Sequence, residues 1–150
     1  MSSKPDFLPL IRELARCYQA FEGFSSRHIR SMGLTACQFD IIATLGNTQG
    51  MNFRDIGERT LITKGTLTGV VDRLEEKLLV QCIPDAQDGR SQIVQLTAAG
   101  EALFVEIFPA HVAYMQRAFV EMNEAEIVDM RAMLMRLGDA FRLPDGETHE

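Results

Sequence analysis

Apolar residues recur every three or four positions through most of this 150-residue chain, and this spacing predicts amphipathic helices. The first such stripe opens at Phe7 and predicts a helix over about residues 6–32, capped by Asp6. Residues 35–38 form a capping box, in which a Thr and a Gln satisfy each other's backbone N–H groups. The box predicts a second helix that begins there and ends near Gly46.

Two short helices with a tight connection between them follow, and this pattern predicts a helix-turn-helix. Asn52 caps the first helix, and Thr63 begins the second, where we expect its side chain to accept an exposed backbone N–H. The second helix, over residues 63–77, has two faces. Its buried stripe is formed by residues at helical spacing: Leu67, Val70, Val71 and Leu74. Its other face is small or hydrogen-bonding: Thr63, Lys64, Thr66, Thr68 and Arg73.

The exposed face of this second helix is unusual, because Thr and Gly lower helix propensity where Glu and Lys would favour it. Gly65 and Gly69 each cost roughly 1 kcal/mol relative to Ala. A requirement other than folding therefore favours a hydroxyl-bearing helix that another molecule can approach closely. Since the major groove of DNA admits a helix and offers hydrogen-bonding base edges, we interpret residues 63–77 as a DNA-reading helix.

A β-hairpin and two longer helices follow. The Asp88-Gly89 turn separates two short, β-branched-rich segments, at residues 79–84 and 91–96, which predicts the hairpin. Thr97 caps a fifth helix, in which Pro109 predicts a kink. A second capping box at residues 123–126 opens the last helix.

The predicted fold is mainly α with a small β-hairpin wing, in a winged helix-turn-helix lobe with N- and C-terminal dimerisation helices. The expected limits are residues 1–150 for one domain, about 35–97 for the lobe, and about 6–32 and 98–142 for the dimerisation helices. Apolar residues near the ends of these helices form a subunit interface or pack on the chain's own core: Phe7, Leu8, Leu10, Ile11, Leu134, Leu137 and Phe141.

Composition limits the cellular compartments and the kinds of chemical site that we expect. No run approaches the ~18 apolar residues of a membrane span, and no signal peptide opens the chain, so we expect a cytoplasmic protein with no membrane partner. Three cysteines without C-x-x-C spacing argue against a disulfide framework, and we expect reduced, mostly packed thiols: Cys17, Cys37 and Cys82. Three histidines share no metal-ligand spacing: His28, His111 and His149. Catalytic motifs are also missing, so we expect no enzyme, metal site or cofactor.

The net charge of −6 argues at first against a nucleic-acid partner. The charge is uneven, however, at +1 over residues 1–50, −1 over residues 51–90 and −6 over residues 91–150. A neutral middle third is compatible with DNA binding if its cations share one face.

The stretches TKGTLTGVVDRLEEK and D-G-R-S-x-x-x-x-L-T-A-A-G resemble the multiple-antibiotic-resistance regulator (MarR) family, and the helix order agrees along nearly the whole chain. The resemblance implies a homodimer that binds an inverted repeat in double-stranded DNA, with residues 63–77 in the major groove and the wing arginine in the minor groove. It further implies a repressor that a small aromatic or phenolic effector releases from DNA. The resemblance does not identify the effector-binding residues, although Arg16 or His28 could meet a carboxylate.

The same resemblance assigns the DNA contacts. The first turns of the helix at 63–77 supply base and phosphate contacts, and Arg73 a further phosphate contact. Asp88 either holds the guanidinium of the wing-tip Arg90 or merely closes the hairpin. The full set is Arg54, Thr63, Lys64, Gly65, Thr66, Thr68, Arg73, Asp88 and Arg90.

Three residues depart from the family pattern: Leu78, Cys82 and Gly89 stand where Gly, Arg and Arg are common. The two missing arginines predict weaker, more salt-limited DNA binding than in typical relatives, and Leu78 predicts a strained left-handed residue. Two alternatives remain open. One is a thiol-based oxidant sensor of the same fold that uses Cys17, and the other is a winged helix used only for protein–protein contact.

Overall fold

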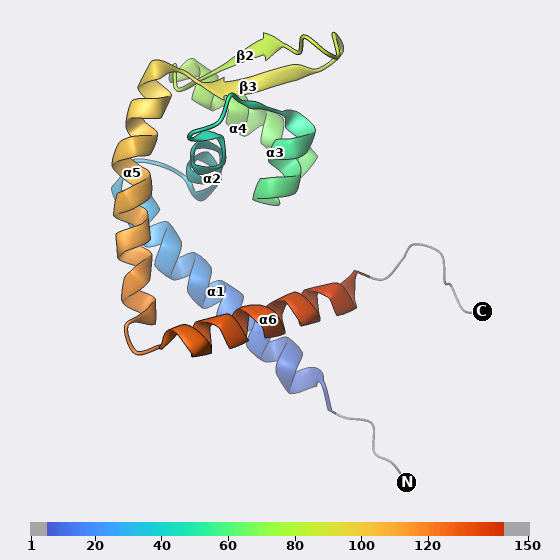
Figure 1. The fold of residues 1–150 in the computed structure, drawn as a ribbon, viewed down its shortest axis with the longest axis vertical. Helices are drawn as coiled ribbons and strands as arrows, with labels where there is room; N and C mark the ends of the chain where they lie inside the picture. Colours follow the sequence, from blue (N-terminus) through green and yellow to red (C-terminus); the bar gives the residue numbers. More distant parts are fainter. Residues whose placement is uncertain (1–5, 143–150) are drawn as a thin grey trace, which may run out of the picture. The chain divides into compact units, whose positions relative to one another are not determined.

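The computed structural model describes residues 6–142, which form six α-helices, one 3-10 helix and three short strands (Figure 1). In chain order they are α1 (Leu8–Ser31), α2 (Ala36–Leu45), β1 (Met51–Asn52), α3 (Phe53–Thr60), α4 (Lys64–Glu76), β2 (Val80–Pro84), β3 (Gln92–Leu96), α5 (Ala98–Gln116), η1 (Arg117–Phe119) and α6 (Glu124–Phe141). The mainly helical fold with a hairpin wing is confirmed. His149 lies outside the described residues.

The chain divides into two compact units, one ending at Tyr114 and one beginning at Met115. The first unit contains α1 to α4, the three strands and most of α5, and it carries the helix-turn-helix and the wing. The second unit contains the end of α5, η1 and α6. None of the helices in residues 6–142 is both long and apolar enough to cross a membrane.

The core of the first unit is built around α2. Ile41, Ile42 and Leu45 of this helix have no solvent exposure, because α1, α3, α4 and β3 all pack against it. The helix starts where the sequence predicts, since Gln38 donates its backbone N–H to Thr35 at 3.2 Å and accepts the Thr35 N–H at 3.1 Å. The predicted stripe of α4 lies against the same core, with Val71 and Leu74 fully buried, Leu67 2% exposed and Val70 partly buried.

The three strands form one antiparallel sheet in the order β1–β3–β2. Its two-stranded part is the predicted hairpin, with Val80 opposite Leu96 and Pro84 opposite Gln92. The third strand, β1, is absent from the sequence interpretation. It pairs Met51 with Val94 and so ties the wing to the residue that begins α3.

The base of the wing is fixed to the start of α5. Thr97 donates its hydroxyl to the Leu78 carbonyl at 2.7 Å and its backbone N–H to the Leu79 carbonyl at 3.0 Å. The Thr97 hydroxyl also accepts the Gly100 N–H at 3.1 Å, which confirms the predicted cap. A Cβ at Gly100 would collide with the Leu79 carbonyl, so only glycine fits there.

Two helix ends differ from the sequence prediction. Phe7, not Asp6, is the first residue before α1, although the Asp6 carboxylate accepts the Leu8 N–H at 3.1 Å. The helix α5 continues through Pro109 and ends at Gln116, and η1 follows it, whereas the apolar stripe predicts a helix to about Val120.

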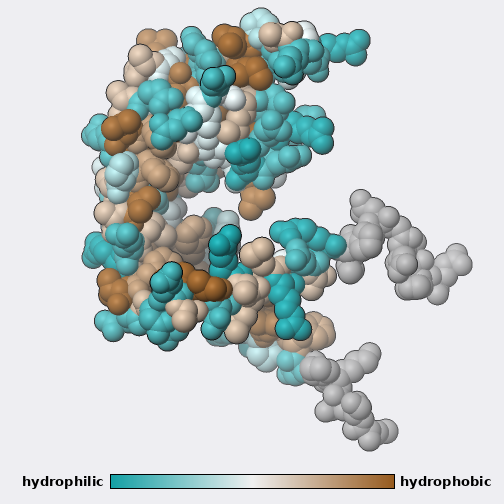
Figure 2. Space-filling model, viewed as in Figure 1, coloured by the Kyte–Doolittle hydropathy of each residue, from teal (hydrophilic) through white to brown (hydrophobic). Residues whose placement is uncertain are grey.

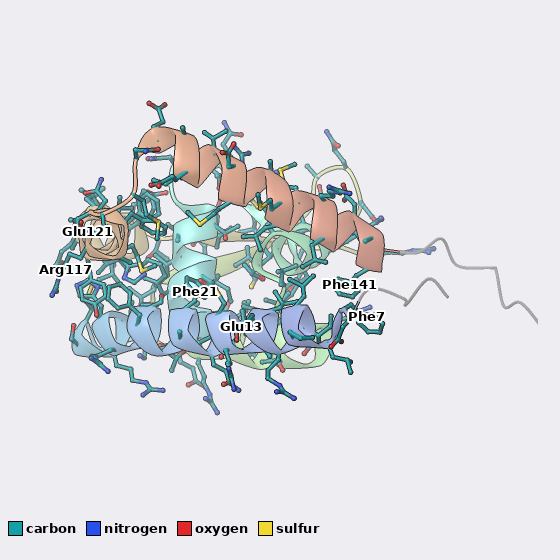
Figure 3. All side chains as sticks on the ribbon, turned by 90° about the horizontal axis from the view of Figure 1, so that it is seen from below. Phe7, Glu13, Phe21, Arg117, Glu121 and Phe141 are labelled. Atoms are coloured by element: carbon teal, nitrogen blue, oxygen red, sulfur yellow. The ribbon has the colours of Figure 1, made fainter. Side chains whose placement is uncertain are left out.

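In the second unit, Asn123 and Glu126 form the predicted capping box of α6, with both hydrogen bonds at 2.9 Å. Most of α6 is exposed, and Phe141 lies at its C-terminal end (Figure 3).

Candidate nucleic-acid interface

The outward face of α4 is open to solvent along its whole length. The side chains predicted to contact DNA from this helix are all exposed: Thr63, Lys64, Thr66, Thr68 and Arg73. A Cβ added at Gly65 or Gly69 would meet no atom within 4 Å, so packing within the described chain does not require either glycine. The low helix propensity of this face therefore has no explanation in folding and leaves a surface that another molecule can approach closely.

The N-terminus of α4 differs from the expected cap. Thr63 occupies the capping position, but its side chain makes no cap hydrogen bond and instead donates its hydroxyl to the Thr66 hydroxyl at 3.1 Å. Thr66 and Leu67 direct their N–H groups to the Thr63 carbonyl, whereas within residues 6–142 the N–H groups of Lys64 and Gly65 find no acceptor. Free N–H groups at a helix N-terminus are suited to bind an anion such as phosphate.

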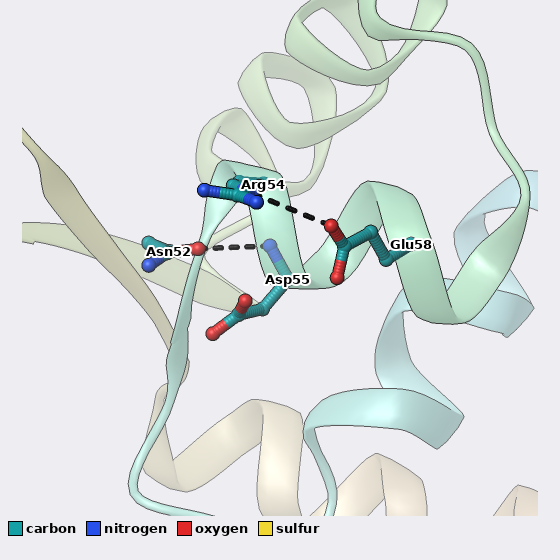
Figure 4. Close-up of polar contacts among 4 residues, drawn as sticks. All are labelled: Asn52, Arg54, Asp55 and Glu58. Carbon is teal, nitrogen blue, oxygen red and sulfur yellow. Dashed lines mark hydrogen bonds and ion pairs between the residues drawn. The ribbon is translucent and has the colours of Figure 1, made fainter. Parts of the chain in front are cut away.

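Arg54 lies in the first turn of the preceding helix, α3, and its contact with Glu58 is drawn in Figure 4. Asn52 caps α3 as predicted and accepts the Asp55 N–H at 2.8 Å. Arg54 forms an ion pair with Glu58 at 3.4 Å, and both side chains remain largely exposed. A groove of about 560 Å³ between α3 and α4 has an apolar floor of Phe53, Ile62 and Leu67 and a polar rim that includes Arg54 and Lys64.

Asp88 closes the wing turn, which is the second of the two roles considered for it. The Asp88 carboxylate accepts the backbone N–H of Arg90 at 3.1 Å, and its carbonyl accepts the Ser91 N–H at 2.9 Å. Asp88 and the Arg90 guanidinium form no ion pair with one another. Arg90 is exposed, and its side chain has no partner within residues 6–142.

The cations of this surface are therefore mostly unpaired. Lys64, Arg73 and Arg90 form no ion pair within the described residues, and Arg54 keeps a single exposed partner. Figure 2 shows hydrophilic side chains over α3 and over the tip of the wing. Charged side chains that the fold leaves free are available to phosphate groups.

The residues that depart from the family pattern have defined places. Leu78 adopts the left-handed conformation at φ 61°, as predicted. Cys82 is partly buried, and burial together with the nearby Glu75 carboxylate raises the pKa of its thiol to about 11. Gly89 lies in the open wing turn.

Two features escaped the sequence interpretation. Leu61, in the connection between α3 and α4, is also left-handed, at φ 60°. The position of Leu61 directly after the predicted end of one helix could have indicated this conformation, because helices often end on a left-handed residue. His28 and His111 contact one another, and no local pattern links two residues 83 positions apart.

Other candidate residues lie outside this surface. Arg16 is exposed on α1 and pairs with Glu13 at 3.1 Å. Cys17 is exposed, contrary to the expectation of packed thiols, while Cys37 and Cys82 are partly buried. Over residues 6–142, His, Cys, Asp and Glu side chains form no group of three that could hold a metal ion.

Comparison with known proteins points to regulators of transcription. The sequence model of the MarR family matches residues 34–92. The chain is 30% identical over 131 residues to the HTH-type transcriptional regulator MhqR of Bacillus subtilis, with 87% of this chain and 90% of that protein covered. It is 27% identical to the HTH-type transcriptional repressor NicR of Pseudomonas putida, with 85% and 80% covered.

A solved structure agrees. BpsR of Bordetella bronchiseptica, whose DNA binding is regulated by 6-hydroxynicotinic acid, superposes with a TM-score of 0.79 at 28% identity. The match covers 92% of this chain and 99% of that one. The fold is thus shared over nearly the whole length of both proteins.

Proposed function

The chain belongs to the MarR family of transcriptional regulators, and on that premise we propose that it is a homodimeric DNA-binding repressor released by a small aromatic effector. The observation that carries the proposal is the outward face of α4, where exposed hydroxyls, unpaired cations and free N–H groups gather. Such a surface offers donors to both phosphates and base edges in a major groove. A catalytic role has no support among the relatives, which are regulators.

Each contact has a stated role in this proposal. The N–H groups of Lys64 and Gly65 bind a phosphate, and the absence of a side chain at Gly65 lets the backbone approach closely. The hydroxyls of Thr63, Thr66 and Thr68 hydrogen-bond to base edges or phosphates. The cations Arg54, Lys64 and Arg73 bind phosphates. Arg90 enters the minor groove from the wing, and Asp88 keeps the wing turn closed.

The homodimer is supported by apolar surface that each unit leaves uncovered. At the N-terminal end of α1, Leu8 is 63% exposed and Leu10 is 53% exposed. Phe7, which precedes the helix, is also 63% exposed (Figure 3). Leu134 and Phe141 of α6 are 60% and 59% exposed, and Leu137 is partly buried. Soluble monomers rarely expose large apolar patches, so a second copy of the chain is the proposed cover.

A dimer fixes the form of the DNA site. Two copies of α4 in successive major grooves lie about 34 Å apart, and the site is an inverted repeat with half-site centres about 10 bp apart. A functional site that lacks dyad symmetry would contradict the dimer.

The effector is proposed from the relatives, because NicR is a repressor and BpsR responds to a hydroxylated aromatic acid. Arg16 and His28, the two residues considered as partners of an effector carboxylate, both have partners within the chain. Arg16 already pairs with Glu13, and His28 bonds to His111.

A mobility-shift assay on the DNA upstream of the chain's own gene tests the proposal. We expect a shifted band with specific DNA and its loss with a scrambled fragment of equal length. A thermal-shift screen of aromatic carboxylates and phenols then identifies the effector, since a ligand of the folded dimer raises its melting temperature. Binding to neither fragment would overturn the proposal in favour of a protein-contact role, and equal binding to both would overturn sequence-specific recognition.

The exposure of Cys17 favours a second candidate function, oxidant sensing through a thiol. Titration with an organic hydroperoxide distinguishes it from the effector mechanism. If DNA affinity is unchanged after oxidation, oxidant sensing is excluded. If oxidation lowers the DNA affinity of the wild type but not that of Cys17→Ser, oxidant sensing through Cys17 is established.

A further inference from the structure

Leu61 combines two features that folding alone does not favour. It adopts φ 60° and ψ 15°, a left-handed conformation that a side chain with a Cβ rarely takes. It is also 88% exposed, more than any other large hydrophobic side chain in residues 6–142. Glycine or asparagine would meet the backbone requirement at lower cost and would expose no apolar surface.

The connection around Leu61 holds it in this conformation. Its N–H bonds to the Gly57 carbonyl at 3.1 Å, which ends α3. The Thr60 hydroxyl donates to the Ile56 carbonyl at 2.7 Å and accepts the Ile62 N–H at 3.3 Å. Because both neighbours are fixed and Ile62 packs against the core, residue 61 cannot relax and its side chain points to solvent.

The position of Leu61 places this side chain at the candidate interface. It lies two residues before Thr63 and three before Lys64, at the N-terminus of α4 where the free N–H groups are. A side chain there meets whatever approaches the start of α4. The only apolar groups that DNA offers in its grooves are thymine methyls and deoxyribose carbons.

We infer that Leu61 is a DNA-contacting residue that packs its methyl groups on apolar atoms of the DNA, either a thymine methyl or a deoxyribose. This inference rests on the proposed DNA-binding function. It adds an apolar contact to a surface that otherwise consists of hydroxyls, cations and N–H groups.

The chain contains a matched control. Leu78 has nearly the same conformation, at φ 61°, and is 73% exposed, but it follows the C-terminus of α4. The 13 residues of α4 separate the two positions by about 20 Å. A substitution by Asn relieves the same backbone strain at either site, but only at residue 61 does it remove the proposed contact.

The test compares Leu61→Asn, Leu78→Asn and Leu61→Met with the wild-type protein. Both Asn variants are expected to melt at a higher temperature, by about 2–4 °C, because Asn tolerates the left-handed region. Leu61→Asn is expected to bind operator DNA about tenfold more weakly, since it loses the burial of an apolar side chain. Leu78→Asn and the apolar Leu61→Met are expected to keep the wild-type affinity.

Deoxyuridine substitution in the operator separates the two sources of apolar surface, because it removes only the thymine methyl. If deoxyuridine at one position lowers the DNA affinity of the wild-type protein but not that of Leu61→Asn, the contact is with the thymine methyl at that position. If Leu61→Asn binds the operator more weakly but deoxyuridine has no effect at any position, the contact is with a deoxyribose.

Equal DNA affinity of Leu61→Asn and wild type overturns the inference, as does an equal loss in Leu78→Asn. Failure of the wild-type protein itself to bind DNA would instead refute the proposed function.

Discussion

His28 and His111 lie with their Nδ1 atoms 2.9 Å apart, which joins α1 to α5 within the first unit. The ring centroids are 5.2 Å apart, and the two ring planes are inclined by 20°. Because this separation is about the nitrogen–nitrogen distance plus the radius of each ring, the imidazoles meet edge to edge. His111 is 7% exposed and its Nε2 lies 3.2 Å from the Ser25 hydroxyl. One Nδ1 must donate and the other accept, so this contact requires at least one neutral imidazole.

This pair predicts a loss of stability in mild acid. Burial, and secondly the charge of His28, lower the pKa of His111 below its ordinary value of 6.5. The titratable groups facing His111 are His28 and Tyr114, and α2 presents the neutral Phe39. As the pH falls below 6.5, His111 is protonated in the unfolded chain before it is protonated in the folded chain. The free energy of unfolding therefore keeps its full contribution from this residue above pH 6.5 and decreases as the pH falls.

Urea unfolding at pH 7.5 and pH 5.5 measures this difference. The His111→Asn variant, which cannot titrate at this position, serves as the control and should show a smaller change between the two pH values. An equal change in both proteins would show that other groups cause the loss.

Replacing the wing-tip arginine should weaken DNA binding without unfolding the protein. Arg90→Ala is expected to lose about 1–3 kcal/mol of binding free energy, because the guanidinium is free to contact DNA. Its melting temperature should stay at the wild-type value, since the side chain has no partner within residues 6–142. Gln87→Ala in the same turn is the matched control, and a similar loss there would assign the effect to the turn.

Asp88 should act through its oxygen acceptor and not through its charge. Its carboxylate accepts the Arg90 N–H, a role that an amide oxygen can fill. We therefore expect Asp88→Asn to retain DNA affinity, and Asp88→Ala to lose about 1 kcal/mol of folding stability as well as affinity. Loss of affinity in Asp88→Asn alone, at unchanged stability, would restore the guanidinium-orienting role.

The salt dependence of binding counts the phosphate contacts. About four cations per subunit, Arg54, Lys64, Arg73 and Arg90, give a slope of log affinity against log salt concentration of about −7 for the dimer. Fluorescence anisotropy with labelled operator between 50 and 200 mM salt, roughly the range over which such contacts are resolved, measures it. A slope shallower than about −3 contradicts this set of contacts.

The cysteines should differ in reactivity. At neutral pH the Cys82 thiol stays protonated, since its pKa is raised to about 11, and only the thiolate is nucleophilic. Cys17 is exposed, so iodoacetamide should modify it before Cys82. Mass spectrometry of the digested protein after timed labelling gives the order, and prior modification of Cys82 would contradict the environment described for it.

The sequence by itself determined the features that depend on neighbours along the chain. The capping boxes that open α2 and α6, the Asn52 cap and the Asp88-Gly89 turn all form where they were predicted. Each needs only residues within about four positions of one another, so its geometry follows from local backbone chemistry. The buried stripe of α4 was equally predictable, because helical periodicity decides which residues share a face.

Only the tertiary structure decided the features that depend on distant residues or on competition between partners. Met51 forms a strand because Val94 lies beside it, and His28 meets His111 because α1 and α5 pack together. The choice between local partners was also left open by the sequence: Thr63 bonds to the Thr66 hydroxyl and not to a backbone N–H, and Asp88 bonds to a backbone N–H and not to a guanidinium. A sequence states which hydrogen bonds a side chain can make, but the three-dimensional arrangement determines which of them are within reach.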